Sequence, residues 1–325
     1  MAALRRSALT LVALAFLGPG LSWAGPLRPL PLRRATYSET FTFIGDLDDG
    51  TYVQLTLSLT NLGPGSLKGL CRALVFPPQG PAFRASARVG HDEVNFGAGP
   101  PERLGVGSCS ATADDLATVA TVKLEGGTVE LAFAQAPLKH SPHDATFEVG
   151  GDRYTSDVLI YRAGVKATLT LPDGKARTVD GRGYVDHSRT TIPPKNLARH
   201  FIRFRGLRGD KGLLLLGRET WQGDFAPLWA CLGSEDCQDY RSFHLDRQGS
   251  GRDSTFRIEV KGPEGSLLLR SGTLLYRDAP VEDLGLLGHL VAPLTGSPVT
   301  YVYRGTASRG DETIEGILEV ELLDD

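Results

Sequence analysis

The sequence predicts an all-β protein made of two antiparallel β units. Three observations support this prediction. Apolar and polar residues alternate with a period of two along most of the chain, as in half-buried strands. The 39 glycines and 20 prolines of the 325 residues separate short apolar runs without any periodicity, as in turn-rich β proteins. Helical patterns are few and short, and the chain is longer than the roughly 100–150 residues of one typical domain, so two units are expected.

The first 24 residues have the pattern of a cleaved signal peptide. Two arginines precede the apolar run 8–17, and a Gly-Pro-Gly segment ends it. Ser22 and Ala24 then place small residues at the two positions that determine cleavage. The run is shorter than the roughly 20 apolar residues of a membrane helix, and no later run reaches that length. The sequence therefore predicts a mature chain that begins at Gly25, is exported to the periplasm or beyond, and has no transmembrane segment.

After a Pro-rich lead-in over 25–34, expected to be extended and loosely held, the period-two runs pair into hairpins across Gly-containing turns. In chain order, the predicted strand pairs are 40–44 with 52–59, 118–124 with 128–133, 165–171 with the strand entering 181–190, 201–207 with 212–221, 255–260 with 266–272, and two final strands within 299–323. The best helix candidates are short, at 113–115 and 281–290.

Four cysteines are candidates for disulfides, because export exposes them to an oxidising compartment. Cys231 and Cys237 flank one short polar loop and form the expected local bridge. Cys71 and Cys109 would then pair by elimination, although four cysteines allow three connectivities and free buried thiols are the alternative. No Cys-x-x-Cys occurs, which excludes thioredoxin-type and zinc-knuckle motifs.

Several function classes lack any signal. The net charge of −3 and the absence of a basic run beyond the N-terminus do not indicate that the protein binds nucleic acid. No G-x-S-x-G, H-E-x-x-H or P-loop motif is present, and no cofactor is expected. His140, His143 and Asp144 are crowded like metal ligands, but the proline between them favours a solvated loop. Trp221 and Trp229 are expected in the core or at the rim of a pocket.

The segment 181–190, GRGYVDHSRT, is the most distinctive stretch. Gly181 and Gly183 have no side chains, so the backbone there can lie close to another strand or a ligand. Strand alternation places Tyr184 and Asp186 on one face and His187 on the other. The acid and the base are therefore expected to be presented separately.

The run GRGYVDH, residues 181–187, resembles the GxGYxDH signature of the tandem lipocalin-like superfamily, which includes carotenoid 1,2-hydratases (hydroxyneurosporene synthases), bacterial AttH-type proteins and fungal survival-factor lipid-binding proteins. Pro194, the region of Arg199, and the segments FIRFRG, GTA and GILE are similar as well. The resemblance implies two lipocalin-like barrels in tandem, over 25–193 and 194–325. Where family members commonly continue with Asn-Trp-Gly, this chain has Ser-Arg-Thr, which weakens a transfer of hydratase activity.

The resemblance implies that a barrel cavity binds an apolar small molecule, a lipid or an isoprenoid, with Tyr184, Trp221 and Trp229 as candidate ligand contacts. The alternative is a cofactor-free hydratase or isomerase. There Asp186 would protonate a C=C bond, with a pKa raised by an apolar pocket, and His187 would be its candidate catalytic partner. In the structural alternative, Asp186 accepts hydrogen bonds at a barrel end, His187 links the barrels and the core is filled. The ligand's identity and the oligomeric state stay open.

Overall fold

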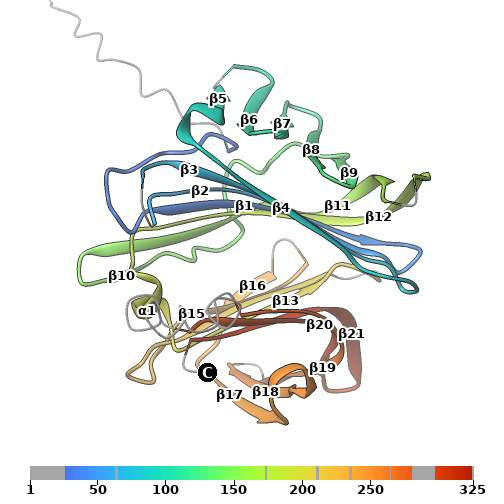
Figure 1. Ribbon diagram of the computed structural model, residues 1–325. Coiled ribbons are helices and arrows are strands. Elements are labelled where there is room, and N and C mark those ends of the chain that lie inside the picture. The colour runs from blue at the N-terminus through green and yellow to red at the C-terminus, as the bar shows by residue number, and fades with distance from the viewer. Residues whose placement is uncertain are drawn as a thin grey trace, which may run out of the picture.

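The structure of the protein is a computed structural model, which describes residues 26–62, 65–97, 99–172, 174–209, 212–233, 236–263, 265–279 and 297–323. Two antiparallel, barrel-shaped sheets lie one above the other (Figure 1). The predicted signal peptide at 1–24 and the helix predicted at 281–290 lie outside the described residues. Within them, no helix has the length and apolar character needed to cross a membrane.

The first sheet, called here the first barrel, has the strand order β4-β3-β2-β1-β12-β11-β9-β8-β7-β6-β5, with β10 paired to β11. Its strands are β1 Ser38–Leu47, β2 Tyr52–Thr60, β3 Lys68–Phe76, β4 Phe83–Val89, β5 Val94–Gly97, β6 Glu102–Val106, β7 Cys109–Ala113, β8 Thr118–Leu124, β9 Gly127–Phe133, β10 Phe147–Val149, β11 Asp152–Thr170 and β12 Ala176–Thr190. A short 3₁₀ helix, η1 His91–Glu93, precedes β5.

The second sheet, called here the second barrel, has the order β16-β15-β14-β13-β21-β20-β19-β18-β17. Its strands are β13 His200–Gly206, β14 Leu213–Glu219, β15 Phe225–Leu232, β16 Asp236–Asp239, β17 Ser242–Gln248, β18 Thr255–Gly262, β19 Gly265–Asp278, β20 Val299–Arg309 and β21 Glu312–Leu322, with η2 Gly251–Asp253 before β18. The connection between the barrels contains α1 Pro194–Leu197. The domain boundary expected at residues 193/194 falls in this connection and stays a prediction.

The predicted hairpins are confirmed as strand pairs: β1 with β2, β8 with β9, β11 with β12, β13 with β14, β18 with β19, and β20 with β21. The helix predicted at 113–115 is wrong. Ala113 ends β7, and the Asp114 carboxylate accepts the backbone N–H groups of Leu116 and Ala117 at 2.8 Å. An aspartate that caps its own turn in this way competes with helix formation.

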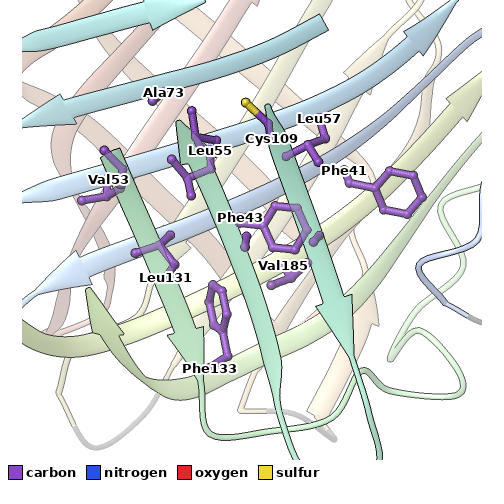
Figure 2. Packing of buried hydrophobic residues seen from close by; sticks show 14 of the residues in the cluster. Phe41, Phe43, Val53, Leu55, Leu57, Ala73, Cys109, Leu131, Phe133 and Val185 are labelled. Carbon is purple, nitrogen blue, oxygen red and sulfur yellow. The ribbon is translucent and has the colours of Figure 1, made fainter. Parts of the chain in front are cut away.

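Among the described residues, three apolar cores hold the fold together. One fills the first barrel, where inward residues of β1, β2, β9 and β12 meet (Figure 2). Another fills the second barrel. The third lies between the barrels and draws residues from both, including Tyr52, Tyr184, Trp229 and Ile317. This shared core means that the two barrels bury one another's outer faces.

Both expected disulfides are present. Cys231 and Cys237 face each other across β15 and β16, so their bridge ties one local hairpin. The Cys71–Cys109 bridge joins β3 to β7, from opposite halves of the first sheet, over a sequence separation of 38 residues. It therefore links strands that the sheet order keeps far apart. Two disulfides are typical of proteins outside the cytoplasm.

The lead-in segment is anchored rather than loosely held, contrary to the expectation. The backbone N–H of Leu27 donates to Glu102 at 2.9 Å, and that of Leu30 donates to Glu39. Further along, the Asn61 side chain donates to the carbonyl of Arg34 at 2.9 Å. A Pro-rich run lacks many backbone donors of its own, but side chains of distant strands bind the donors and acceptors that remain.

Candidate functional site

A cleft of about 1170 Å³ lies at one end of the first barrel, between the lead-in segment, the loop that follows β9 and strand β12; we call it the first-barrel cleft. Its wall is both apolar and charged. The apolar part includes Leu30, Pro100, Ala113, Ala136, Pro137, Leu138 and Leu159, and the polar part includes Arg28, Asp114, Lys139, His143, Asp157, His187 and Arg189. A molecule with an apolar body and polar groups matches such a wall.

His187, the last residue of the GxGYxDH-like run, is on the wall of this cleft. It lies opposite Phe41 in the β1–β12 register, and the two rings stack with centroids 4.2 Å apart. Its Nε2 lies 2.6 Å from Oε1 of Glu39. Among the contacts of the described residues, Nδ1 of His187 has no hydrogen-bond partner.

Glu39 is a fully buried carboxylate with several donors around it. Its oxygens accept the hydroxyl of Tyr37 and the backbone N–H of Leu30, besides the contact with His187. Burial by itself would raise the pKa of Glu39, but the hydrogen bond and charge of His187, together with the donors from Tyr37 and Leu30, outweigh it and lower the pKa. Burial and the neighbouring carboxylate raise the pKa of Tyr37, which keeps its proton.

The Tyr37–Glu39–His187 cluster therefore pairs an ionised carboxylate with an imidazole on a cleft wall. A carboxylate bound to one ring nitrogen fixes the tautomer and the orientation of the ring. Such an imidazole can take up or deliver a proton at its other nitrogen. Sequence reasoning missed Glu39, although a signal exists: Glu39 alternates with Phe41 and Phe43, so a charged residue occupies an inward position of β1.

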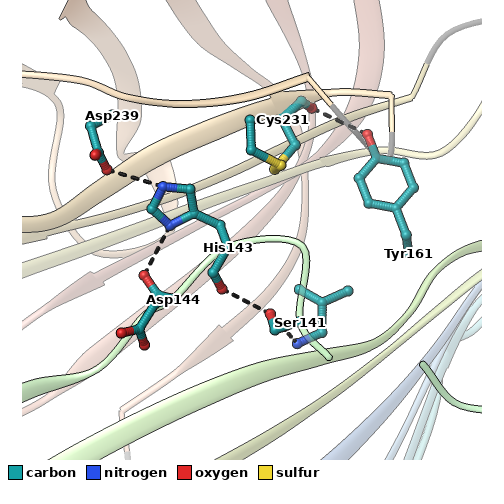
Figure 3. Close-up of a disulfide and its surroundings, with 8 residues drawn as sticks. Ser141, His143, Asp144, Tyr161, Cys231 and Asp239 are labelled. Atoms are coloured by element: carbon teal, nitrogen blue, oxygen red, sulfur yellow. Dashed lines mark hydrogen bonds and ion pairs between the residues drawn. A yellow bond between two sulfur atoms is a disulfide. The ribbon is translucent and has the colours of Figure 1, made fainter. Parts of the chain in front are cut away.

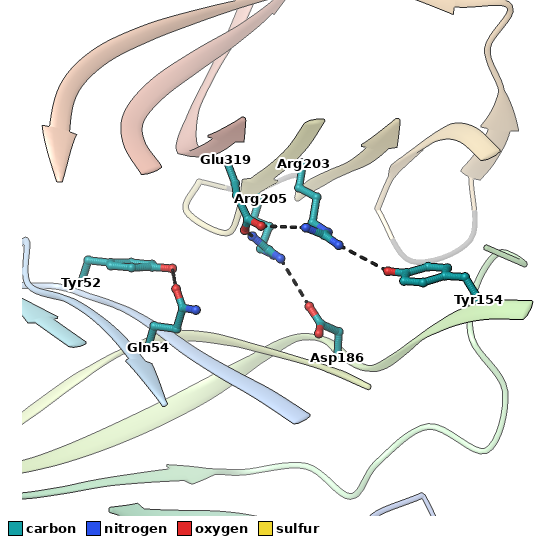
Figure 4. Close-up of polar contacts among 7 residues, drawn as sticks. All are labelled: Tyr52, Gln54, Tyr154, Asp186, Arg203, Arg205 and Glu319. Atoms are coloured by element: carbon teal, nitrogen blue, oxygen red, sulfur yellow. Dashed lines mark hydrogen bonds and ion pairs between the residues drawn. The ribbon is translucent and has the colours of Figure 1, made fainter. Parts of the chain in front are cut away.

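Asp186 faces the opposite way, as strand alternation predicts. Its Oδ2 lies 3.3 Å from Nη2 of Arg205 in β13, and Nη1 of Arg205 lies 2.8 Å from Glu319 in β21 (Figure 4). Arg203 reaches the other oxygen of Glu319 at 2.7 Å and the hydroxyl of Tyr154 at 3.3 Å. We call these five residues the inter-barrel charge cluster, since it joins strands of both barrels.

The charges of this cluster stabilise one another. Burial opposes ionisation of Glu319, but the charges of Arg203 and Arg205 lower its pKa to about 2. The Arg205 guanidinium also lies over the ring of Tyr184, 5.0 Å from its centroid. Because Arg205 binds two carboxylates, it is the residue that connects Asp186 to the second barrel.

The candidate ligand contacts from the sequence do not meet at the cleft. Tyr184 and Trp229 are buried in the core between the barrels. Trp221 is 47% exposed, and its indole N–H donates to the Lys195 carbonyl at 3.0 Å. None of the three is part of the described wall of the first-barrel cleft. Their roles in binding stay predictions.

The loop that contains His140 and His143 reaches the second barrel, where His143 lies beside Asp239 (Figure 3). His143 lines the cleft, its Nε2 lies 3.1 Å from Asp239 in β16, and its ring stacks on Trp229. Close by, the Tyr161 hydroxyl donates to the Cys231 carbonyl at 3.1 Å. The described residues contain no group of three or more His, Cys, Asp or Glu side chains able to hold a metal ion. The loop thus contacts the second barrel through His143, while Lys139, His140 and Asp144 are exposed, as expected for a solvated loop.

No protein-family model and no curated protein matches the chain. Solved structures of similar fold include CghA with Sch210972, at 13% sequence identity over 93% of this chain and 95% of that one, with a TM-score of 0.59. A putative AttH from Nitrosomonas europaea has 14% identity over 91% and 98%, with a TM-score of 0.59. Kievitone hydratase from Nectria haematococca has 12% identity over 94% and 92%, with a TM-score of 0.54. The predicted fold, two lipocalin-like barrels in tandem, is thereby confirmed.

Proposed function

We propose that the protein is exported and binds a small amphipathic molecule, a lipid or isoprenoid that carries a polar group, in the first-barrel cleft. The observation that carries this proposal is a cleft of about 1170 Å³ with the histidine of the GxGYxDH-like run on its wall. Ligand sites commonly have volumes of about 300–1,000 Å³, so the space suffices for a lipid-sized molecule. The fold relative solved with a bound compound, CghA with Sch210972, agrees with a ligand-binding role.

The lining refines the class of ligand. A purely apolar molecule would leave the charged groups of the wall, such as Asp157 and Arg189, without partners on its side of the cleft. Polar groups on the ligand would supply those partners, while Leu138 and Leu159 would contact its apolar body. Export is supported by the signal-like pattern of residues 1–24 and by the two disulfides.

Mass spectrometry of the exported protein tests both parts of the proposal. We expect an intact mass that begins at Gly25 and an organic extract that contains an amphipathic molecule. Ala136 lines the cleft, so Ala136→Trp should fill part of it and reduce the amount of bound ligand by about tenfold or more. Ala134 is exposed outside the described wall, so Ala134→Trp is the matched control. Retention of residues 1–24, or equal ligand in the two variants, would contradict the proposal.

A second candidate function is cofactor-free proton transfer, as in hydration or isomerisation of a C=C bond. The observation in its favour is the His187–Glu39 contact on the wall of the cleft, and one fold relative is a hydratase, kievitone hydratase. The resemblance assigns the acid to Asp186, whereas Asp186 is bound to Arg205 at 3.3 Å and is not part of the described wall of the cleft. His187 is therefore the better candidate for the proton-transfer group.

Incubation of the extracted ligand with the protein in H₂¹⁸O separates the two assignments. We expect His187→Gln to lower any incorporation of labelled water by roughly 10²-fold, because the amide cannot exchange a proton near neutral pH. Asp186→Asn should leave incorporation nearly unchanged. A stable Asp186→Asn variant that binds the ligand but adds no water would make Asp186 the acid instead. Absence of incorporation by the unaltered protein would exclude hydration; an isomerisation adds no oxygen and would instead be detected as deuterium exchanged into the ligand in D₂O.

A further inference from the structure

A second hollow, of about 310 Å³, opens beside the first-barrel cleft and is lined by four arginines. We call it the arginine pocket; its lining includes Arg33, Arg34, Arg153, Arg189, Thr155 and Thr191, and no aspartate or glutamate is part of the described lining. The whole chain carries a net charge of −3, whereas the charged residues that line this pocket are all positive. Positive charge concentrated in a hollow attracts anions.

The lead-in segment supplies two of the arginines. The Asn61 amide donates to the carbonyls of Leu32 and Arg34, each at 2.9 Å, and the Tyr37 N–H donates to the Arg34 carbonyl at 3.1 Å. These bonds fix the backbone that carries Arg33 and Arg34. The two charges are thus brought to the pocket by an ordered segment.

Strands β11 and β12 supply the other two. Thr155 lies opposite Arg189 in their register. The backbone N–H of Arg153 donates to the Thr191 hydroxyl at 3.0 Å, and the backbone N–H of Thr191 donates to the Arg153 carbonyl at 2.9 Å. Alternate residues of a strand share a face, so these four side chains lie on one face of the sheet. Two guanidinium groups and two hydroxyls therefore line this wall of the pocket.

The four guanidinium groups form no ion pair and no side-chain hydrogen bond within the described residues. The acids near them include Glu39, Glu148, Asp144 and Asp157, and Asp157 lines the first-barrel cleft with Arg189 without an ion pair between them. Glu39 lies opposite Arg189 but is bound to His187 and Tyr37, and Glu148 lies opposite Arg153 without an ion pair. Hydrogen bonds from Thr146 lower the pKa of Asp144, with a smaller contribution from the charge of Arg153. The donors of the pocket are therefore available to an external anion.

Arg189 lines both the arginine pocket and the first-barrel cleft, so the two hollows meet at this residue. We propose that the arginine pocket binds a phosphate-type oxyanion, a phosphate or sulfate group, which forms the head of the amphipathic ligand whose body occupies the cleft. Guanidinium groups bind such oxyanions through two parallel N–H···O hydrogen bonds. The continuity with the cleft rests on the proposed binding function, whereas the anion site itself does not.

Calorimetric titration of the intact protein with decyl phosphate, decanol and inorganic phosphate tests the proposal. We expect decyl phosphate to bind at least about tenfold more tightly than decanol, since hydrogen bonds to charged groups carry that much affinity. The double variant Arg33→Gln/Arg153→Gln should lose this preference. Arg88 and Arg270 are exposed and outside the pocket, so Arg88→Gln/Arg270→Gln is the control with the same change of charge.

The three probes separate the possible failures. If each phosphate probe binds the double variant and its control with equal affinity, the arginine pocket is not an anion site, whether or not decanol binds. Binding of inorganic phosphate that the double variant loses, as tight as that of decyl phosphate, would support a site for a free anion and contradict the link to the cleft. Weakening of both decanol and decyl phosphate by Ala136→Trp supports both hollows as parts of one site, whereas weakening of decanol alone would contradict the link to the cleft.

Discussion

Replacement of Arg205 by methionine is expected to lower the free energy of unfolding by about 3–5 kcal/mol. Arg205 binds Asp186 and Glu319, whose side chains are only 9% and 16% exposed. Methionine has a similar length but leaves both carboxylates buried beside each other with less compensating charge. Chemical denaturation monitored by tryptophan fluorescence measures the loss.

A surface arginine gives the matched control. Arg257 contacts Asp246 at 3.5 Å, but their side chains are 52% and 46% exposed, so Arg257→Met should cost less than about 1 kcal/mol. Asp186→Asn alone should destabilise less than Arg205→Met, because the amide oxygen still accepts a hydrogen bond from Arg205. Added to Arg205→Met, it should recover part of the loss by removing an unpaired charge. A loss in Arg205→Met no greater than in Arg257→Met would contradict a structural role for the inter-barrel charge cluster.

Acidification is expected to destabilise the protein steeply below about pH 4.5. The pKa of Glu319 is lowered from 4.5 to about 2 in the folded protein, and that of Glu39 is also lowered. A carboxyl with a lower pKa in the folded state stabilises that state fully above the unfolded value, and this stabilisation is lost as pH falls through the folded value. For Glu319 the loss between pH 4.5 and pH 2 is on the order of 3 kcal/mol.

Unfolding free energies measured from pH 7 to pH 2 check this expectation. Glu319→Gln should be less stable at neutral pH and should show a shallower slope below pH 4.5, because the titrating group is gone. Glu315 is exposed on the same strand, so Glu315→Gln should keep the slope of the unaltered protein. An equally steep acid slope in Glu319→Gln would show that Glu319 does not contribute to it.

Local patterns in the sequence were sufficient for most of the fold. Period-two alternation predicted the hairpins from β1–β2 to β20–β21, because each is closed by a short turn and needs only neighbouring residues. The same alternation separated Asp186 from His187, since it fixes the face of each residue once the strand is known. The helix at 113–115 failed because a single aspartate side chain competes for the backbone donors of its turn.

Local patterns did not predict the sites, because the residues of each site come together only through long-range pairing of strands. Glu39 meets His187 because β1 pairs with its sheet neighbour β12, which lies 148 residues further along the chain. Asp186, Arg205 and Glu319 meet because the outer faces of two separate sheets pack together. The lead-in segment brings Arg33 to the wall of a hollow formed by strands far along the chain.

The sequence by itself determined the strands of six local hairpins, the opposite faces of Asp186 and His187, and the cysteine pairs available for bridging; strands β3–β7, β10 and β15–β17 were not predicted. The tertiary structure alone decided that Glu39 binds His187, that Arg205 joins the barrels and that four arginines surround one hollow. The physical reason is that alternation and turn chemistry act over a few residues. The free-energy cost of closing a long loop, by contrast, grows only slowly with its length, so sequence spacing scarcely distinguishes one distant partner from another. The choice among distant partners is made by the total burial and pairing of whole sheets.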